Sequence, residues 1–357
     1  MARAGEEIER AGLEGLLVSP SADLLYLTGY DPPHLPRLTC LVLRPGSDAV
    51  LLVPELERPR ALESAAGSEV QVLSWRDGDD PYGHVARLLD GAGTYAVADR
   101  MWASHLLGLQ GALSGAGFVP ASRILAGLRA VKDQDELGLL SRAARGADAA
   151  FHTVLGRRLG GLREEEVAAI LADLLREGGH EVITFTIVAS GPNGASPHHE
   201  PGGRPIRDGD PVVLDFGGKV GGYCSDISRT VCVGRSHDRL VEVYEIVREA
   251  QEAAFRAVRP GIPAEEVDRA ARDAIEAAGY GDRFLHRTGH GIGLEEHEHP
   301  YIVTGNTEQL RPGMCFSIEP GIYLEGEFGV RIEDIVTVTE TGAARLNRAT
   351  RDLETVS

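Results

Sequence analysis

The sequence has little of several things that particular classes of protein require. Only four of its 357 residues are cysteines, Cys40, Cys224, Cys232 and Cys315, and no two have Cys-x-x-Cys spacing. Scattered cysteines are typical of reduced thiols rather than of a disulfide framework or a thiolate metal site. No apolar run approaches the roughly 18 residues of a membrane-spanning helix, and the first residues carry acids where an export signal needs basic residues. We therefore expect a soluble, cytoplasmic protein.

Positive charge is also scarce. Lysine and arginine number 36 against 54 aspartates and glutamates, which gives a formal net charge of −18. Binding to phosphate backbones or anionic lipid depends on a positive field, so this balance argues against nucleic acid and membranes as partners. A composition of 43% hydrophobic and 25% charged residues excludes general disorder. Because a single hydrophobic core stops growing at about 250–300 residues, the length predicts two domains.

The first third of the chain alternates between helical and strand periods. This pattern predicts a small α/β domain over residues 1–121. Helices are expected at 6–16 and 55–66, and strands at 15–18, 39–43, 49–53, 70–74 and 94–98.

Residues 122–357 predict a separate α+β domain. A long helix is expected over 128–159, with an acidic first turn of the kind that the helix dipole favours. Further helices are expected at 163–177, 237–258 and 264–278, and glycine-rich strands at 183–189, 211–216, 225–233, 314–319 and 329–337. Nearly all polar residues that interrupt apolar runs fall in this domain, so we expect the functional site there.

Two aspartates stand inside β-prone runs of the segment VVLDFGGKVGGYCSDISRTVCV. Asp215 and Asp226 would each cost several kcal/mol to bury without a compensating positive charge. A hairpin centred between Val220 and Gly221 would place them directly opposite each other, with Cβ atoms about 4.5–5.5 Å apart. Such a pair suits the binding of cations, whereas either acid alone would more often form a structural salt bridge or cap a turn.

A second segment, FSIEPGIYLEGEFGVRIEDIV, repeats this arrangement. Glu319 and Glu333 lie in apolar runs, and a hairpin folded about Gly326 would set them opposite each other. Two hairpins that each deliver two buried acids, with few basic residues in the same runs, favour a metal site over separate structural roles.

Histidine supplies the remaining kind of ligand. His290 stands among Gly289, Gly291 and Gly293, which allow another group to approach the backbone closely. Four carboxylates and one imidazole, without thiolates arranged for binding, favour a hard divalent cation such as Mn(II), although Co(II) or Zn(II) would also fit.

These segments resemble the metal-site motifs of a known family. VLDFGGKVGGYCSDISRT, TGHGIGLEEHEHP, FSIEPGIY and GVRIED are similar, in this order, to motifs of the pita-bread metallopeptidases, which include prolidase, aminopeptidase P and methionine aminopeptidase. The resemblance covers residues from about 125 to 340, and the first domain is similar to that of bacterial Xaa-Pro dipeptidases. It implies a creatinase/aminopeptidase-like pita-bread fold for the second domain.

The resemblance also implies a centre of two divalent metal ions. Asp215 would hold one ion bidentately, Asp226 and Glu333 would bridge both, and His290 and Glu319 would complete the other. Two neighbouring cations lower the pKa of a shared water and leave a hydroxide as nucleophile. Hydrolysis of a peptide bond is therefore the implied reaction.

Further residues take roles by the same resemblance. His198 and His297 stand where the family places two outer histidines that contact the scissile carbonyl and the developing oxyanion. Glu319 would act as acid and base, unless it is a ligand only. Arg331 would share a strand face with Glu333 and could orient a ligand carboxylate or bind a substrate group. Tyr223 could position Asp226 by a hydrogen bond, or it could simply pack.

The choice within the family depends on the first domain and on carboxylate recognition. The extra domain favours the Xaa-Pro branch over methionine aminopeptidase, and the complete ligand set argues against creatinase. A dipeptidase must recognise the free carboxylate of its substrate, usually with arginine or histidine. Some prolidases carry an arginine in a stretch like HExPR, where this chain has Tyr301, a candidate substrate contact. We expect Arg37, in the loop DPPHLPRLT, to reach the site of a partner subunit instead, with a plain surface arginine as the alternative.

The sequence thus predicts a metal-dependent Xaa-Pro dipeptidase that acts on proline-containing di- or short peptides as a homodimer. Aminopeptidase P, which trims longer peptides, is the nearest alternative. A non-catalytic peptide-binding module is a remote one, because it would retain four mutually repelling buried carboxylates with no cation to neutralise them.

Overall fold

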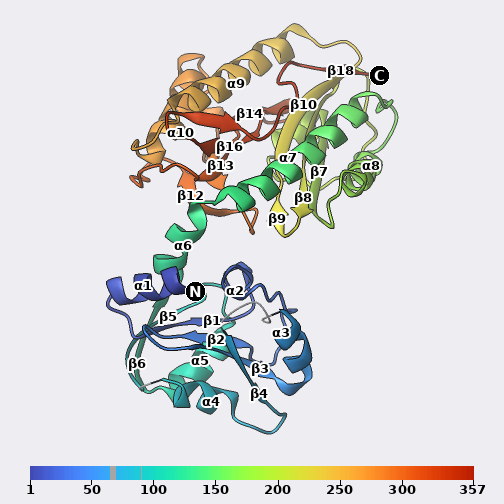
Figure 1. Ribbon diagram of the computed structural model, residues 1–357. Helices are drawn as coiled ribbons and strands as arrows, with labels where there is room; N and C mark the ends of the chain where they lie inside the picture. The colour runs from blue at the N-terminus through green and yellow to red at the C-terminus, as the bar shows by residue number, and fades with distance from the viewer. Residues whose placement is uncertain (65–69, 90) are drawn as a thin grey trace. The chain divides into compact units, whose positions relative to one another are not determined.

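The chain forms two compact units, Met1–Arg129 and Ala130–Ser357 (Figure 1). The computed structural model describes residues 1–64, 70–89 and 91–357. The boundary expected after residue 121 precedes α6 (Ser122–Ala130), and this helix packs Ile124, Leu125 and Leu128 into the core of the first unit. Among the described residues, no helix is long and apolar enough to cross a membrane.

The first unit is a six-stranded sheet with helices on both faces. The strand order is β4-β3-β2-β1-β5-β6. Strand β2 is antiparallel to both of its neighbours, and the other pairs are parallel. The strands are β1 (Gly15–Val18), β2 (Cys40–Leu43), β3 (Ala49–Pro54), β4 (Val70–Trp75), β5 (Ala92–Val97) and β6 (Gly115–Pro120). The helices besides α6 are α1 (Ala2–Arg10), α2 (Ala22–Thr28), η1 (Glu55–Glu57), α3 (Arg58–Ser64), α4 (Pro81–Arg87) and α5 (Ala103–Ala112).

Alternate strand residues divide between two hydrophobic clusters. In β1, Leu16 and Val18 pack with α1, α2 and α6, while Leu17 packs on the other face with α4 and α5. This division follows from the two-residue period of a strand that is covered on both faces. The predicted α/β class of this domain is confirmed.

Two helix predictions in this unit need correction. The helix expected at 6–16 is instead α1, which ends near Gly12 because that residue adopts a left-handed φ of 66°. The helix expected at 55–66 begins as η1 and continues as α3 to Ser64, and residues 65 and 66 lie outside the described part of the chain.

The second unit contains two five-stranded sheets and a separate hairpin. The orders are β18-β10-β8-β7, with β9 paired to β8, and β12-β11-β13-β16-β17, while β14 pairs with β15. The strands are β7 (Val182–Ser190), β8 (Pro211–Val220), β9 (Tyr223–Cys224), β10 (Ile227–Val233), β11 (Gly289–Gly291), β12 (Glu298–Ile302), β13 (Cys315–Ile318), β14 (Gly321–Leu324), β15 (Phe328–Arg331), β16 (Asp334–Val338), β17 (Ala343–Arg345) and β18 (Thr355–Val356). The helices are α7 (Gln134–Leu155), α8 (Glu164–Glu177), η3 (Gly191–Ala195), α9 (Asp238–Ala257), α10 (Ala264–Ala277) and η4 (Gly281–Arg283).

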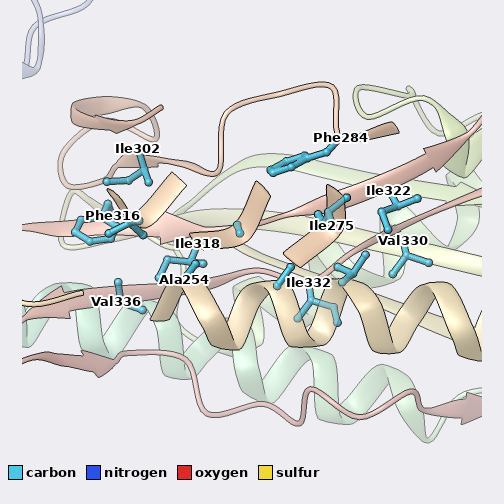
Figure 2. Close-up of a cluster of buried hydrophobic side chains, with 14 of the residues drawn as sticks. Ala254, Ile275, Phe284, Ile302, Phe316, Ile318, Ile322, Val330, Ile332 and Val336 are labelled. Carbon is cyan, nitrogen blue, oxygen red and sulfur yellow. The ribbon is translucent and has the colours of Figure 1, made fainter. Parts of the chain in front are cut away.

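Helices cover these sheets in two groups. Helices α7 and α8 pack with β7, β8 and β10 around one cluster of buried side chains. Helices α9 and α10 pack against each other and against β13 to β16 around a second cluster. Figure 2 shows part of this second cluster, including Ala254 of α9, Ile275 of α10, Phe316 and Ile318 of β13, and Val330 of β15. The burial of these two clusters fixes the positions of the strands that carry the polar residues described below.

The single long helix expected over 128–159 is two helices. Helix α6 ends at Ala130, and α7 begins only after Asp133. The side chain of Asp133 accepts a hydrogen bond from the Glu136 backbone, and Glu136 bonds back to the Asp133 backbone. This capping box starts a new helix where the apolar period alone suggests continuity.

Candidate active site

The hairpin of β8 with β9 and β10 has a different register from the one predicted. Its turn is Gly221–Gly222, with left-handed φ values of 57° and 84°, as a two-residue hairpin turn of this hand requires. Asp215 therefore lies opposite Ser228, not opposite Asp226. The prediction was wrong by two residues, but side chains two apart project from the same face. Asp226 thus stays on the face that carries Asp215.

The second hairpin has the predicted register. Gly321 pairs with Arg331 and Leu324 with Phe328 about Gly326, and the same register continues in the pairing of Ile318 with Asp334. Glu319 and Glu333 lie in the gap between these two ladders, opposite each other.

The acids of both hairpins and His290 line one cavity of about 540 Å³. Ligand atoms of Asp226, His290 and Glu333 lie within 4.8 Å of one another. His290 Nε2 lies 3.2 Å from Glu319 Oε1 and 3.8 Å from Asp226 Oδ2. The cavity is lined by Phe185, Ile187, Pro197, His198, Asp215, Asp226, His286, Arg287, His290, Glu296, His297, Glu319, Arg331 and Glu333.

Two serines fix the carboxylates. Ser228 Oγ donates to Glu333 Oε2 at 3.0 Å. Ser317 Oγ donates to Glu319 Oε1 and accepts the backbone N–H of His290, both at 3.0 Å. Both serines are fully buried. The sequence gives no signal for them, because a serine inside a strand run has many ordinary structural roles.

Arg331 holds Asp215. Its buried guanidinium donates from Nη2 to Asp215 Oδ2, from Nε to Ser228 Oγ and from Nη1 to the Tyr323 hydroxyl. It also reaches the carbonyl of Pro197. The expectation that Arg331 lies beside a ligand carboxylate agrees with this geometry.

The four acids have the donor chemistry of a site for divalent cations. Asp215 Oδ1 and Glu333 Oε1 are buried and accept no hydrogen bond among the described residues, and such atoms are costly unless something positive approaches them. Burial and the charges of Asp215 and Glu319 raise the pKa of Asp226 far above its usual range. Burial and the charge of Asp226 do the same to the pKa of Glu333. One guanidinium does not neutralise this set, and oxygen donors with one imidazole fit hard or borderline divalent metals.

The pKa of Glu319 is shifted in the opposite direction from those of Asp226 and Glu333. Burial raises its pKa, but the hydrogen bond and charge of His290 outweigh burial and lower the pKa to about 2. Glu319 is therefore an ionised carboxylate between an imidazole and a serine hydroxyl.

The two outer histidines predicted from the sequence line the same cavity. The His297 ring centroid is 4.0 Å from that of His290. Burial, together with the charges of His290 and Arg287, lowers the pKa of His297 to about 4, so it is neutral near pH 7. His198 follows Pro197, whose carbonyl is bound by Arg331.

Two predicted substrate contacts of the second unit, Tyr223 and Tyr301, do not line the cavity in the described structure. The Tyr223 hydroxyl donates to Glu136 Oε1 at 2.7 Å, so the prediction that it positions Asp226 is wrong. Tyr301 lies behind Arg287, whose guanidinium carbon is 4.4 Å from the tyrosine ring centroid. Arg37 belongs to the first unit, where it forms an exposed ion pair with Asp77 at 2.7 Å; its role at a partner's site stays a prediction.

Several residues of the cavity have no role predicted from the sequence. His286 Nε2 lies 2.7 Å from the Tyr323 hydroxyl. Because Arg331 donates to that hydroxyl oxygen, the hydroxyl hydrogen is directed at His286. Phe185 and Ile187 supply an apolar wall from β7. Their only sequence signal is membership of a strand, which does not distinguish a cavity wall from a core.

Both units of the chain match models of known protein families. The model of metallopeptidase family M24 matches residues 138–340, and the model of the creatinase/prolidase N-terminal domain matches residues 1–131. The chain is 45% identical over 358 residues to a probable dipeptidase PepE of Mycobacterium tuberculosis, covering 99% of this chain and 95% of the relative. It is 38% identical over 347 residues to a Xaa-Pro dipeptidase of Pyrococcus furiosus, covering 97% of each. The crystal structure of dipeptidase PepE from Mycobacterium ulcerans superposes with a TM-score of 0.96 at 45% identity, covering 99% of this chain and 96% of that one.

The chain belongs to metallopeptidase family M24, with a creatinase/prolidase N-terminal domain. It is an enzyme that hydrolyses peptide bonds with divalent metal ions, and the pita-bread fold expected from its motifs is confirmed.

Proposed function

We propose that the enzyme is a Xaa-Pro dipeptidase that hydrolyses the peptide bond before proline. The observation that carries this proposal is the convergence of Asp215, Asp226, His290, Glu319 and Glu333 in one cavity, with two buried carboxylate oxygens that accept no hydrogen bond in the described structure. The names of the relatives supply the substrate class: those quoted above are called dipeptidase or Xaa-Pro dipeptidase.

The same five residues are the proposed ligands of two divalent metal ions. Their oxygen-rich donor set favours Mn(II), and Co(II) or Zn(II) would be accepted. When bound, the ions would supply an acidified water and polarise the scissile carbonyl.

The chain's own residues would then orient the substrate and carry protons. His198 and His297 would donate hydrogen bonds to the carbonyl oxygen as it gains negative charge. Glu319 would take a proton from the attacking water and pass it to the proline nitrogen as the C–N bond breaks. Arg331 would keep Asp215 in its orientation through the hydrogen bonds described above.

The proposed place for the proline ring is the apolar wall formed by Phe185 and Ile187. A pyrrolidine ring has no N–H donor once it is acylated, so an apolar wall loses nothing by lacking an acceptor for it.

Arg37 remains the proposed contact from a partner subunit, and the proposal includes a homodimer. Light scattering should give a mass twice that of one chain. Arg37→Ala should weaken discrimination between Ala-Pro and Ala-Pro-Ala, and unchanged discrimination would remove Arg37 from the site. A cytoplasmic location is also proposed, supported by four cysteines that are buried free thiols.

The test of the proposed function is an assay of the Mn(II)-loaded protein on Ala-Pro, Ala-Ala and Ala-Pro-Ala side by side. Fastest cleavage of Ala-Pro supports the proposal. Preference for Ala-Pro-Ala would reassign the enzyme to the aminopeptidase P activity, and equal cleavage of Ala-Ala would remove the proline requirement.

A further inference from the structure

Arg287 is a cation in the cavity with no carboxylate partner in the described part of the chain. Its side chain is half-buried and lines the cavity together with the four acids and the one histidine of the proposed metal site. The one contact given for its guanidinium is with the ring of Tyr301, at 4.4 Å from the guanidinium carbon to the ring centroid. Glu296 lines the same cavity, but the described structure has no ion pair between the two.

The contact between Arg287 and the Tyr301 ring is not a hydrogen bond, so it leaves the guanidinium donors available. A guanidinium over an aromatic ring is attracted by the ring quadrupole and needs no hydrogen-bond acceptor there. Its N–H donors point outward in the guanidinium plane and match the two oxygens of a carboxylate. Tyr301 therefore orients Arg287 without occupying the donors that would bind an anion.

Arg331, the other arginine of the cavity, is already engaged. Its Nε, Nη1 and Nη2 atoms donate to Ser228, Tyr323 and Asp215. Binding a substrate carboxylate through two donors would require Arg331 to give up at least one of these bonds. Both ring nitrogens of His286 also have partners, the Arg287 carbonyl and the Tyr323 hydroxyl. Of these three residues, Arg287 is therefore the one whose donors can bind the carboxylate of a substrate.

Tyr301 is tied to the metal site through the backbone. It pairs directly with His290 across β11 and β12, and directly opposed residues project from the same face of an antiparallel ladder. The residue that supports Arg287 thus lies on the same side of the ladder as a proposed metal ligand.

We propose that Arg287, held by Tyr301, binds the C-terminal carboxylate of the substrate and so favours dipeptides over longer peptides. This inference rests on the proposed dipeptidase function and adds a residue from the enzyme's own cavity to the contact proposed for Arg37. In a longer peptide the second residue carries an amide in place of the carboxylate, and Arg287 would then face a neutral group.

A binding experiment tests Arg287 independently of turnover. Metal-loaded protein is titrated by calorimetry with N-acetyl-L-proline and with N-acetyl-L-prolinamide, which differ only in the carboxylate. The wild-type enzyme should prefer the acid by about 10- to 100-fold, as expected for a charge-assisted bidentate contact. Arg287→Ala should remove most of this preference, with any remainder due to Arg37, and Arg287→Lys should restore only part of it. Arg283→Ala, which removes an exposed arginine outside the cavity, is the matched control.

Two further variants separate the support from the contact. Tyr301→Phe keeps the ring and should keep the preference, whereas Tyr301→Leu should reduce it. If wild-type protein binds acid and amide equally, or if Arg287→Ala keeps the full preference, the inference is overturned even when Ala-Pro is hydrolysed. If Ala-Pro is not hydrolysed but the acid is preferred through Arg287, the proposed function fails while the carboxylate site stands.

Discussion

Arg331 Nη2 donates a hydrogen bond to Asp215 Oδ2 at 2.5 Å, although the two residues are 116 positions apart. The same guanidinium bonds Ser228 and Tyr323, so one side chain joins β8, β10, β14 and β15. Ser228 in turn donates to Glu333. The orientation of two proposed ligands, Asp215 and Glu333, therefore depends on the planar guanidinium group of Arg331.

We predict that Arg331→Lys lowers metal affinity and kcat/KM by about 10- to 100-fold, the usual effect of removing a contact that orients a ligand. Lysine keeps the charge but lacks the fork. Calorimetric titration with Mn(II) and steady-state kinetics on Ala-Pro measure the two effects. A variant with wild-type metal affinity would show that charge alone is sufficient.

We predict that Asp226→Asn has opposite effects with and without metal. In the presence of a chelator, removing one of four clustered acids should raise the free energy of unfolding by about 1–2 kcal/mol. With Mn(II), the variant should bind fewer ions and lose at least about 100-fold in kcat/KM. Urea unfolding and metal analysis test both parts, with the exposed Asp282→Asn as control. A variant less stable than wild type in chelator would contradict the idea that the acids repel each other.

Glu164 provides a test of pH dependence away from the metal site. Its fully buried carboxylate accepts hydrogen bonds from the Ser190 backbone and hydroxyl, from Asn193 and from His199. Burial raises its pKa, but these hydrogen bonds outweigh burial, so the pKa lies below its usual value of 4.5. The lowered pKa means that the folded state binds this proton less tightly than the unfolded state. Its contribution to stability is therefore complete above pH 4.5 and is lost as the pH falls through the folded pKa.

We predict that Glu164→Gln costs about 1–3 kcal/mol of unfolding free energy near pH 7. The difference from wild type should shrink as the pH is lowered below 4.5. Urea unfolding over this range measures it, and Glu165→Gln, an exposed neighbour, should show little change. A difference that grows on acidification would mean that the sign assigned to Glu164 is wrong.

We predict that Tyr223→Phe leaves kcat/KM on Ala-Pro within about two-fold of wild type and lowers stability by about 1 kcal/mol, through loss of its bond to Glu136. Kinetics and urea unfolding of the same preparation distinguish the two effects. A large loss of activity without loss of stability would restore a role at the site.

The positions of the site's carboxylates could be predicted, because they follow from the two-residue period of the strands. The second hairpin has one glycine turn that matches its apolar alternation, so the opposition of Glu319 and Glu333 follows directly from the sequence. The first hairpin has several glycines that could form the turn, and the choice of Gly221–Gly222 shifts the partner of Asp215 to Ser228. This register error does not change the predicted site. A shift of two residues leaves both aspartates on the same face of the sheet.

Residues that act through long-range contacts could not be predicted. Tyr323 of β14 contacts His286 in the loop before β11, and Ser317 contacts His290 across 27 residues. Hydroxyls and rings of this kind have no periodic signature, and only the packing of α9 and α10 behind β13 to β16 brings them together. The break between α6 and α7 was missed for a similar reason, because a capping box overrides a continuous apolar period.

The most direct test of metal-dependent dipeptidase activity is a titration of metal-free protein with Mn(II), in which bound metal and the initial rate of Ala-Pro hydrolysis are measured in the same samples. A two-metal Xaa-Pro dipeptidase should show no hydrolysis in chelator, two ions bound per chain at saturation, and a rate that rises as the sites fill. Full activity in chelator, or saturation with metal without hydrolysis of Ala-Pro, would contradict this prediction.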